Sequence, residues 1–160
     1  MEACDLRDKI TDSLTLARTL VAQGGIYMDE YKPRQFLQNN LEAAKLFGTY
    51  GKKVQQFRSY IRALDACTLI PDKTAADSVL LLCIKASEEL EDSHDMMADA
   101  YLSYAIEFSS PAEIKNLIDK YHSVPSFQDT SLTMSYAYAR AEEYDRALKI
   151  LSLTELDGSI

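Results

Sequence analysis

The chain has 160 residues, with 17 Lys and Arg against 25 Asp and Glu, so its formal net charge is −8. Its hydrophobic content of 47% argues against disorder, and its 5 Gly and 4 Pro are too few for the many turns of an all-β fold. An acidic chain without a glycine-rich phosphate loop also disfavours nucleic acid and nucleotides as ligands.

The cysteines, the N-terminal residues and the longest aliphatic run together indicate a cellular compartment. Cys4, Cys67 and Cys83 are odd in number and form no CxxC pair, which is typical of reduced thiols in the nucleus or cytoplasm. The N-terminus is acidic rather than signal-like, and the longest aliphatic run, from Val79 to Ile84, is too short to span a bilayer. We therefore expect a soluble protein of the nucleus and cytoplasm without a membrane partner.

Helical periodicity is found nearly everywhere along the chain. Apolar residues recur every three or four positions from Leu6 to Val21, and the Gly24-Gly25 pair predicts the end of this first helix. Prolines at positions 33 and 111 predict two later helix starts, and the proline at position 71 predicts a helix end. The expected helices cover 1–25, 33–48, 52–69, 72–91, 93–108, 111–122, 130–141 and 144–153, with a loop at 124–129.

A short pattern recurs inside these helical hairpins. It places small residues and aromatic residues at fixed offsets from Ala44, from Ser135 and, more weakly, from Ala98. Such spacing is similar to the tetratricopeptide repeat, a helix-turn-helix of about 34 residues in which small residues let neighbouring helices approach and an aromatic fills the gap. The predicted repeat-core residues are Ala44, Phe47, Tyr60, Ala63, Ala98, Tyr101, Ser135, Tyr138, Tyr144 and Ala147.

The predicted fold class is all-α, with antiparallel helical hairpins stacked as a tetratricopeptide-like right-handed solenoid of about eight helices. We expect one N-terminal helical repeat domain over 1–160. It comprises a leading helix at 1–25, repeats at 33–70, 93–123 and 130–156, and an extra helix at 72–91. Because Leu148, Ile150, Leu151 and Leu153 would leave an apolar face open, we expect a fragment of a longer repeat protein.

Four stretches in this order resemble one family. They are AAKLF at 43–47, Ala63-Leu64, ADAY at 98–101 and VPSFQDT at 124–130, and together they resemble the N-terminal region of the anaphase-promoting complex subunit 7 family. The resemblance implies a non-enzymatic scaffold and homodimerisation module of a multisubunit ubiquitin ligase that acts in cell-cycle control. It implies as partners a second copy of the chain and other tetratricopeptide subunits, with no catalytic residue, cofactor, metal or small-molecule substrate.

The first helix has the broadest apolar face and is the candidate dimer interface. Its candidate residues are Leu6, Ile10, Leu14, Leu16, Ala17, Leu20 and Val21. The same face can instead pack on the second and third helices of its own chain, and the two interpretations are compatible because apolar residues lie on more than one side.

Other groupings are weaker. The segment 32–62 has a net charge of +6 and precedes an acidic cluster of Glu88, Glu89, Glu91, Asp92, Asp95 and Asp99, which indicates either solvated helix faces or a basic surface that meets acid on another protein. Asn39, Asn40 and Lys45 are the only trace of a carboxylate-binding array, and they leave open a monomeric tetratricopeptide adaptor that binds a partner's peptide tail. Two acid–histidine pairs, Glu91/His94 and Asp119/His122, lie at expected helix ends, where solvated histidines are more common than metal ligands.

Overall fold

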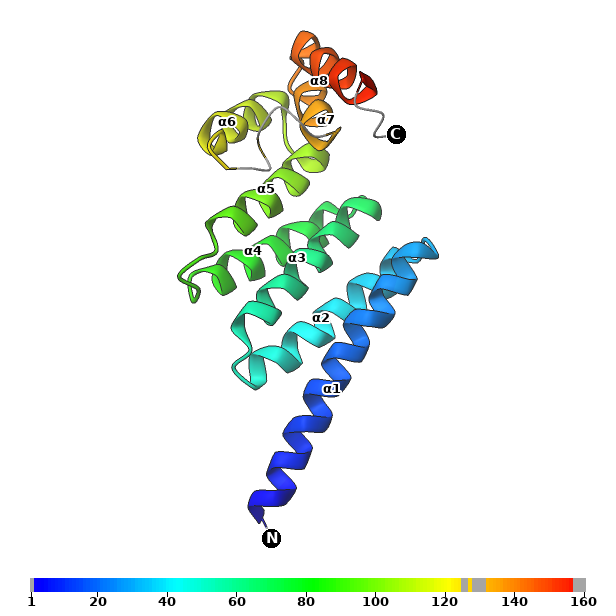
Figure 1. The fold of residues 1–160 in the computed structure, drawn as a ribbon, viewed down its shortest axis with the longest axis vertical. Helices are drawn as coiled ribbons and strands as arrows, with labels where there is room; N and C mark the ends of the chain where they lie inside the picture. Colours follow the sequence, from blue (N-terminus) through cyan, green and yellow to red (C-terminus); the bar gives the residue numbers. More distant parts are fainter. Residues whose placement is uncertain (1, 125–126, 128–131, 157–160) are drawn as a thin grey trace. The chain divides into compact units, whose positions relative to one another are not determined.

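The computed structural model describes the backbone of residues 2–124, 127 and 132–156, and the side chains of 9–124, 127 and 132–152. Within these residues the chain forms eight helices and no strand, so the predicted all-α class is confirmed (Figure 1). The helices are α1 (Glu2–Asp29), α2 (Pro33–Thr49), α3 (Lys53–Leu69), α4 (Lys73–Ser87), α5 (His94–Phe108), α6 (Pro111–Tyr121), α7 (Leu132–Arg140) and α8 (Tyr144–Leu156).

The helices divide into two compact units. Unit 1 spans Met1–Glu91 and holds α1 to α4, and unit 2 spans Asp92–Ile160 and holds α5 to α8. In unit 1 each helix packs on the next one in the sequence, antiparallel to it (Figure 1). The unit boundary falls between the predicted extra helix and the predicted second repeat.

The first helix is longer than its sequence predicts. It continues through Gly24 and Gly25 to Asp29, so the predicted end at this glycine pair is wrong. A Cβ atom at Gly24 would lie 3.1 Å from both Asn40 Nδ2 and Phe36 Cδ2 of α2, whereas a Cβ at Gly25 would meet nothing within 4 Å. Gly24 is therefore required for close approach of α1 and α2, and it does not terminate the helix.

Three helices end in the same hydrogen-bonded turn, the Schellman motif. After α1, Tyr31 N donates to Met28 O (3.1 Å) and Lys32 N donates to Tyr27 O (2.7 Å), with Tyr31 at a φ of +54°. After α2 the left-handed residue is Gly51, with a φ of +67°. After α7 it is Glu142, with a φ of +63°. Because only glycine adopts this conformation without steric cost, Tyr31 and Glu142 are strained positions.

The register of the internal pattern agrees with two of these turns. Gly51 lies seven residues after Ala44, and Glu142 lies seven residues after Ser135. Ala98 has no such turn, since α5 remains helical at Ala105. The first and third copies of the pattern therefore end their first helix alike, and the second does not.

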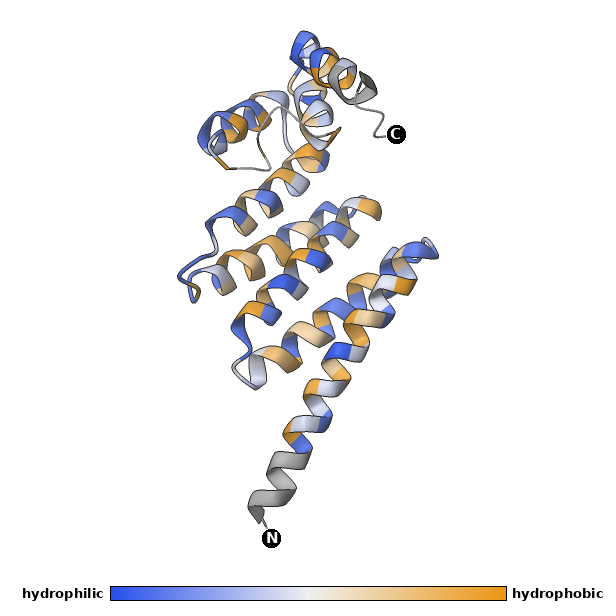
Figure 2. Cartoon of the chain, in the orientation of Figure 1, coloured by the Kyte–Doolittle hydropathy of each residue, from blue (hydrophilic) through white to orange (hydrophobic). Residues whose placement is uncertain are grey.

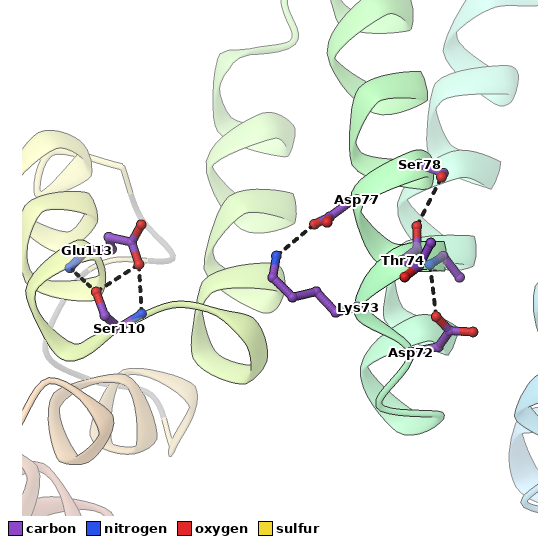
Figure 3. A network of polar contacts seen from close by, with 8 residues as sticks. Asp72, Lys73, Thr74, Asp77, Ser78, Ser110 and Glu113 are labelled. Carbon is purple, nitrogen blue, oxygen red and sulfur yellow. Dashed lines mark hydrogen bonds and ion pairs between the residues drawn. The ribbon is translucent and has the colours of Figure 1, made fainter.

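Side-chain caps fix two helix starts, both drawn in Figure 3. Asp72 Oδ1 accepts a hydrogen bond from Ala75 N (3.0 Å) at the start of α4. At the start of α6, Ser110 Oγ accepts from Glu113 N (3.4 Å), and Glu113 Oε2 in turn accepts from Ser110 N (2.8 Å). This capping box spans the predicted proline, which stands at the first helical position between Ser110 and Glu113.

The fourth helix ends earlier than predicted, at Ser87 rather than at Glu91. The residues beyond it include Glu88, Glu89 and Glu91. Carboxylates are unfavourable at a helix C-terminus, where the peptide carbonyls already carry partial negative charge. The predicted start of α7 at Thr130 falls outside the described residues, and α8 continues to Leu156.

Each unit has its own apolar interior. The hydropathy colouring shows apolar residues recurring between polar ones along the helices (Figure 2). In unit 1 a cluster of Ala17, Leu20, Ala43 and Phe47 joins α1 to α2. In unit 2 a larger cluster joins α5 to α8 around Ile114, Met134 and Ile150. Arg140 Nε also donates to Ile106 O (2.8 Å), which ties α7 to α5.

Candidate functional site: the exposed side of the first helix

The candidate dimer interface is divided by the packing of α1 on α2. Ala17 and Leu20 are buried in the cluster with Ala43 and Phe47, and Leu14 and Val21 pack against its edge. Ala17 and Leu20 are therefore occupied inside their own chain, whereas Leu14 and Val21 are only partly buried. For Ala17 and Leu20 the structure shows the intramolecular packing of the apolar face.

Other apolar residues of α1 stay on the outside. Leu16 is 47% exposed and Ile26 is 56% exposed. Ile10 is partly buried, and the side chain of Leu6 lies outside the described residues. Sequence reasoning missed Ile26 because it ended the helix at Gly24; the apolar residue two positions later was the available signal.

The N-terminal part of α1 extends beyond the helix on which it packs. Helix α1 has 28 residues and α2 has 17, and Tyr50, which follows α2, donates its hydroxyl to Ser13 Oγ (3.1 Å). The eleven residues Glu2–Asp12 therefore continue past the end of α2, over roughly 16 Å at 1.5 Å per residue (Figure 1). An isolated helix of this length has little stability in water, and α2 does not run alongside this part of α1.

The predicted repeat-core residues fall into three groups. Ala44, Phe47, Ala63, Ala98, Ser135, Tyr138 and Ala147 are buried. Tyr60 and Tyr101 are partly buried, Tyr101 against the core of unit 2. Tyr144 differs from the prediction, since its ring is 60% exposed beside an apolar groove of about 360 Å³ between α7 and α8. No described helix covers that side of α8, which explains the exposure.

The array expected for a peptide-tail adaptor is not formed. Asn40 is fully buried between α1 and α2, where its Nδ2 donates to Phe36 O (2.9 Å) and its Oδ1 has no partner. Asn39 Nδ2 donates to Leu20 O (3.3 Å) across the same contact. The Asn39 amide thus joins α2 to α1, whereas the Asn40 amide bonds within α2. Asn39 is partly buried, Asn40 is fully buried, and only Lys45 of the three residues is exposed.

Part of the acidic cluster is paired with the basic segment inside the chain. Lys53 Nζ lies 2.9 Å from Glu89 Oε2, and the hydrogen bond from Lys53 holds the pKa of Glu89 below its usual value. Both side chains are about half exposed, so the pair contributes little to stability. One of the predicted acid–base contacts with another protein is therefore already made within unit 1.

The remaining candidates for chemistry are two cysteines and two histidines. Burial is the main cause that raises the pKa of Cys67 to about 11 and that of Cys83 to about 12, so both thiols are protonated near neutral pH and are poor nucleophiles. The His94 ring lies against Tyr121 with centroids 5.3 Å apart, and His122 Nδ1 lies 2.9 Å from Asp119 O. Among the described residues, no three His, Cys, Asp or Glu side chains gather closely enough to hold a metal ion.

Two further findings concern membrane-spanning helices and known proteins. None of the helices described here is long and apolar enough to cross a membrane. Comparison of the chain with protein-family models, with curated proteins and with solved structures finds no match. The family resemblance therefore rests on the sequence motifs alone, two of which, Ala43–Phe47 and Ala98–Tyr101, lie in the buried parts of α2 and α5.

Proposed function

We propose that the chain is a non-enzymatic helical scaffold that forms a homodimer through α1. The observation that carries the proposal is the state of that helix: it extends about eleven residues past α2 and keeps Leu16 and Ile26 exposed on the sides that α2 does not cover. Pairing with a second copy would bury these side chains and give the extending segment a packing partner.

The assembly that this scaffold serves follows from the resemblance. A relative of the anaphase-promoting complex subunit 7 family would act in a multisubunit ubiquitin ligase of the cell cycle, in the nucleus and cytoplasm, beside other tetratricopeptide subunits. The buried thiols support a structural rather than a catalytic role, because neither is ionised near neutral pH. A stable homodimer of this kind buries at least about 2,000 Å² in total, more than the two exposed apolar residues supply, so the N-terminal segment must take part.

A monomeric adaptor that binds a peptide tail through an asparagine array is the weaker alternative. Asn39 and Asn40 bond to the backbone of α1 and α2, and Asn40 is fully buried. An array of this type needs side-chain amides that face solvent, so the alternative would require α1 to leave α2.

Light scattering coupled to gel filtration tests the proposal. We expect a mass near twice 18.0 kDa at micromolar concentration. Leu16→Glu and Ile26→Glu should shift the mass toward that of the monomer, because each places a charge in the seam. Leu81→Glu is the matched control: Leu81 is 67% exposed on α4, so the same substitution should leave the dimer intact.

Leu16 tests the dimer seam more cleanly than Leu14 does. Leu14 packs against the cluster between α1 and α2, so Leu14→Glu would disturb the fold of unit 1 itself. A monomer at every concentration, or a dimer that survives both Leu16→Glu and Ile26→Glu with an unchanged helical circular dichroism signal, would disprove pairing through α1.

A further inference from the structure

A small groove in unit 1 is lined by three arginines from two helices. Arg18 reaches it from α1, and Arg58 and Arg62 reach it from α3. The groove encloses about 220 Å³ above Phe47 of α2, which is buried beneath it. Ser59 lies between the two α3 arginines in sequence and completes the floor.

None of the ion pairs formed among the described residues includes these arginines. The cations of those pairs are Lys32, Lys53, Lys73, Lys115 and Arg146. No acidic residue stands three or four positions from Arg18 or Arg58 along its helix, whereas Asp65 stands three positions after Arg62. The groove therefore gathers three permanent positive charges, and none of them forms an ion pair with a carboxylate in the part of the chain that the structure describes.

This arrangement is unfavourable for the isolated chain. Arg58 and Arg62 are four residues apart on one helix face, a spacing at which like charges repel and destabilise the helix. The packing of α1 on α2 then brings a third guanidinium to the same groove. An anion held between them would remove this repulsion.

We propose that the groove binds a phosphorylated serine or threonine segment of a partner protein. A phosphoryl group carries a charge of about −1.5 to −2 and three acceptor oxygens, which suits several planar guanidinium forks better than a single carboxylate does. Val21 stands beside Arg18 on the groove wall, and it offers apolar contact to a neighbouring residue of the segment.

The observations favour a protein segment over nucleic acid. The net charge of −8 repels a long polyanion, whereas a short phosphopeptide carries few charges. Phe47, the aromatic residue in the groove, is only 5% exposed and cannot serve as a stacking surface for bases.

The groove is separate from the proposed dimer seam. At 100° and 1.5 Å per residue, Arg18 lies about 160° around α1 from Leu16, and about 80° around and about 12 Å along α1 from Ile26, so a second copy on the Leu16 side would leave the groove open. Phosphopeptide binding and homodimerisation can therefore be tested independently, and the failure of one leaves the other standing.

Fluorescence polarisation with three labelled peptide libraries tests the proposal. The probes are degenerate nonapeptides with a fixed central phosphoserine, serine or glutamate, titrated with the full chain at about 0.1 M salt, where charge screening is moderate. We expect saturable binding of the phosphoserine library and at least about tenfold weaker binding of the other two, since charge-assisted hydrogen bonds are the strong ones.

Substitutions locate the binding. Arg58→Gln combined with Arg62→Gln should weaken phosphoserine binding at least about tenfold, as should Arg18→Gln to a smaller degree. Lys85→Gln is the matched control, because it removes one exposed positive charge from α4 of the same unit, outside the groove. Arg58→Lys keeps the charge but removes the fork, and it should lose part of the affinity.

Three results would overturn the proposal. The first is equal binding of the phosphoserine and serine libraries. The second is unchanged affinity in the Arg58→Gln/Arg62→Gln variant with its helical circular dichroism signal retained. The third is tighter binding of a labelled oligouridylate than of the phosphoserine library, which would assign the groove to nucleic acid.

Discussion

The contact between α1 and α2 makes a sharp prediction for two adjacent glycines. Gly24 and Gly25 both lie inside α1, so replacing either by alanine should gain the same helix propensity, about 1 kcal/mol. Their surroundings differ. A Cβ at Gly25 meets nothing within 4 Å, whereas a Cβ at Gly24 lies 3.1 Å from Asn40 Nδ2 and from Phe36 Cδ2.

The magnitude follows from what those neighbours can do. Asn40 is fully buried and bonded to Phe36 O, and Phe36 is itself buried, so neither side chain can move aside freely. Overpacking of this kind costs about 1–3 kcal/mol. Gly25→Ala should therefore stabilise unit 1 by about 1 kcal/mol, and Gly24→Ala should destabilise it by up to about 2 kcal/mol after the propensity gain is subtracted.

Urea unfolding followed by circular dichroism at 222 nm measures the two free energies of unfolding. Because the chain has two compact units, hydrogen exchange of the α2 amides should be read alongside, so that the change is assigned to unit 1. If both alanine variants are stabilised equally, Gly24 is not a packing glycine, and the account of why α1 continues past it is wrong.

Three further predictions concern other parts of the fold. Glu142→Gly should stabilise unit 2 by about 1 kcal/mol, because Glu142 holds a φ of +63° that glycine adopts without strain, and the urea midpoint measures this; a lower midpoint would contradict it. Burial raises the pKa of Cys67 and Cys83 in the folded chain to about 11 and about 12, so their stabilising contribution is complete below the unfolded thiol pKa near 9 and is lost as pH rises toward these values. In a Cys4→Ser variant, the free energy of unfolding should therefore fall between pH 9 and 11, and the two thiols should react with a disulfide reagent only on unfolding; rapid labelling of the folded chain would refute this. Ser110→Ala should cost about 1 kcal/mol and increase hydrogen exchange in the first turn of α6, because both hydrogen bonds of the capping box are lost or weakened; unchanged exchange there would show that the box contributes nothing.

Sequence periodicity predicted the helices well where their starts carry local chemical signals. The prolines at 33 and 111 stand at the first helical positions of α2 and α6, as their positions in the sequence predict. The end of α1 was mispredicted because a glycine that caps a helix and a glycine that admits a neighbouring helix look alike in one sequence. Only the position of Phe36 and Asn40 against Gly24 separates the two meanings.

The candidate site was predictable only in part. The apolar face of α1 was found from its spacing, but spacing does not tell whether Ala17 and Leu20 meet α2 or a second copy, and the structure places them against α2. The arginine groove could not be predicted from the sequence for a different reason. The basic segment 32–62 contains Arg58 and Arg62, whereas Arg18 stands far from them in the sequence and joins them only through the packing of α1 on α2.

The absence of a side chain at Gly24 also limits how far α1 can slide along α2. A slip of one helical turn, about 5.4 Å, would bring a larger side chain opposite Asn40 and Phe36 and break the bond from Asn39 to Leu20 O. A buried amide between two apolar helices disfavours every register but the one that accommodates it. By fixing this register, Gly24 sets the length of α1 that extends beyond Tyr50 and the position of Arg18 relative to α3. The absence of one methyl group therefore positions both the proposed dimer seam and the arginine groove.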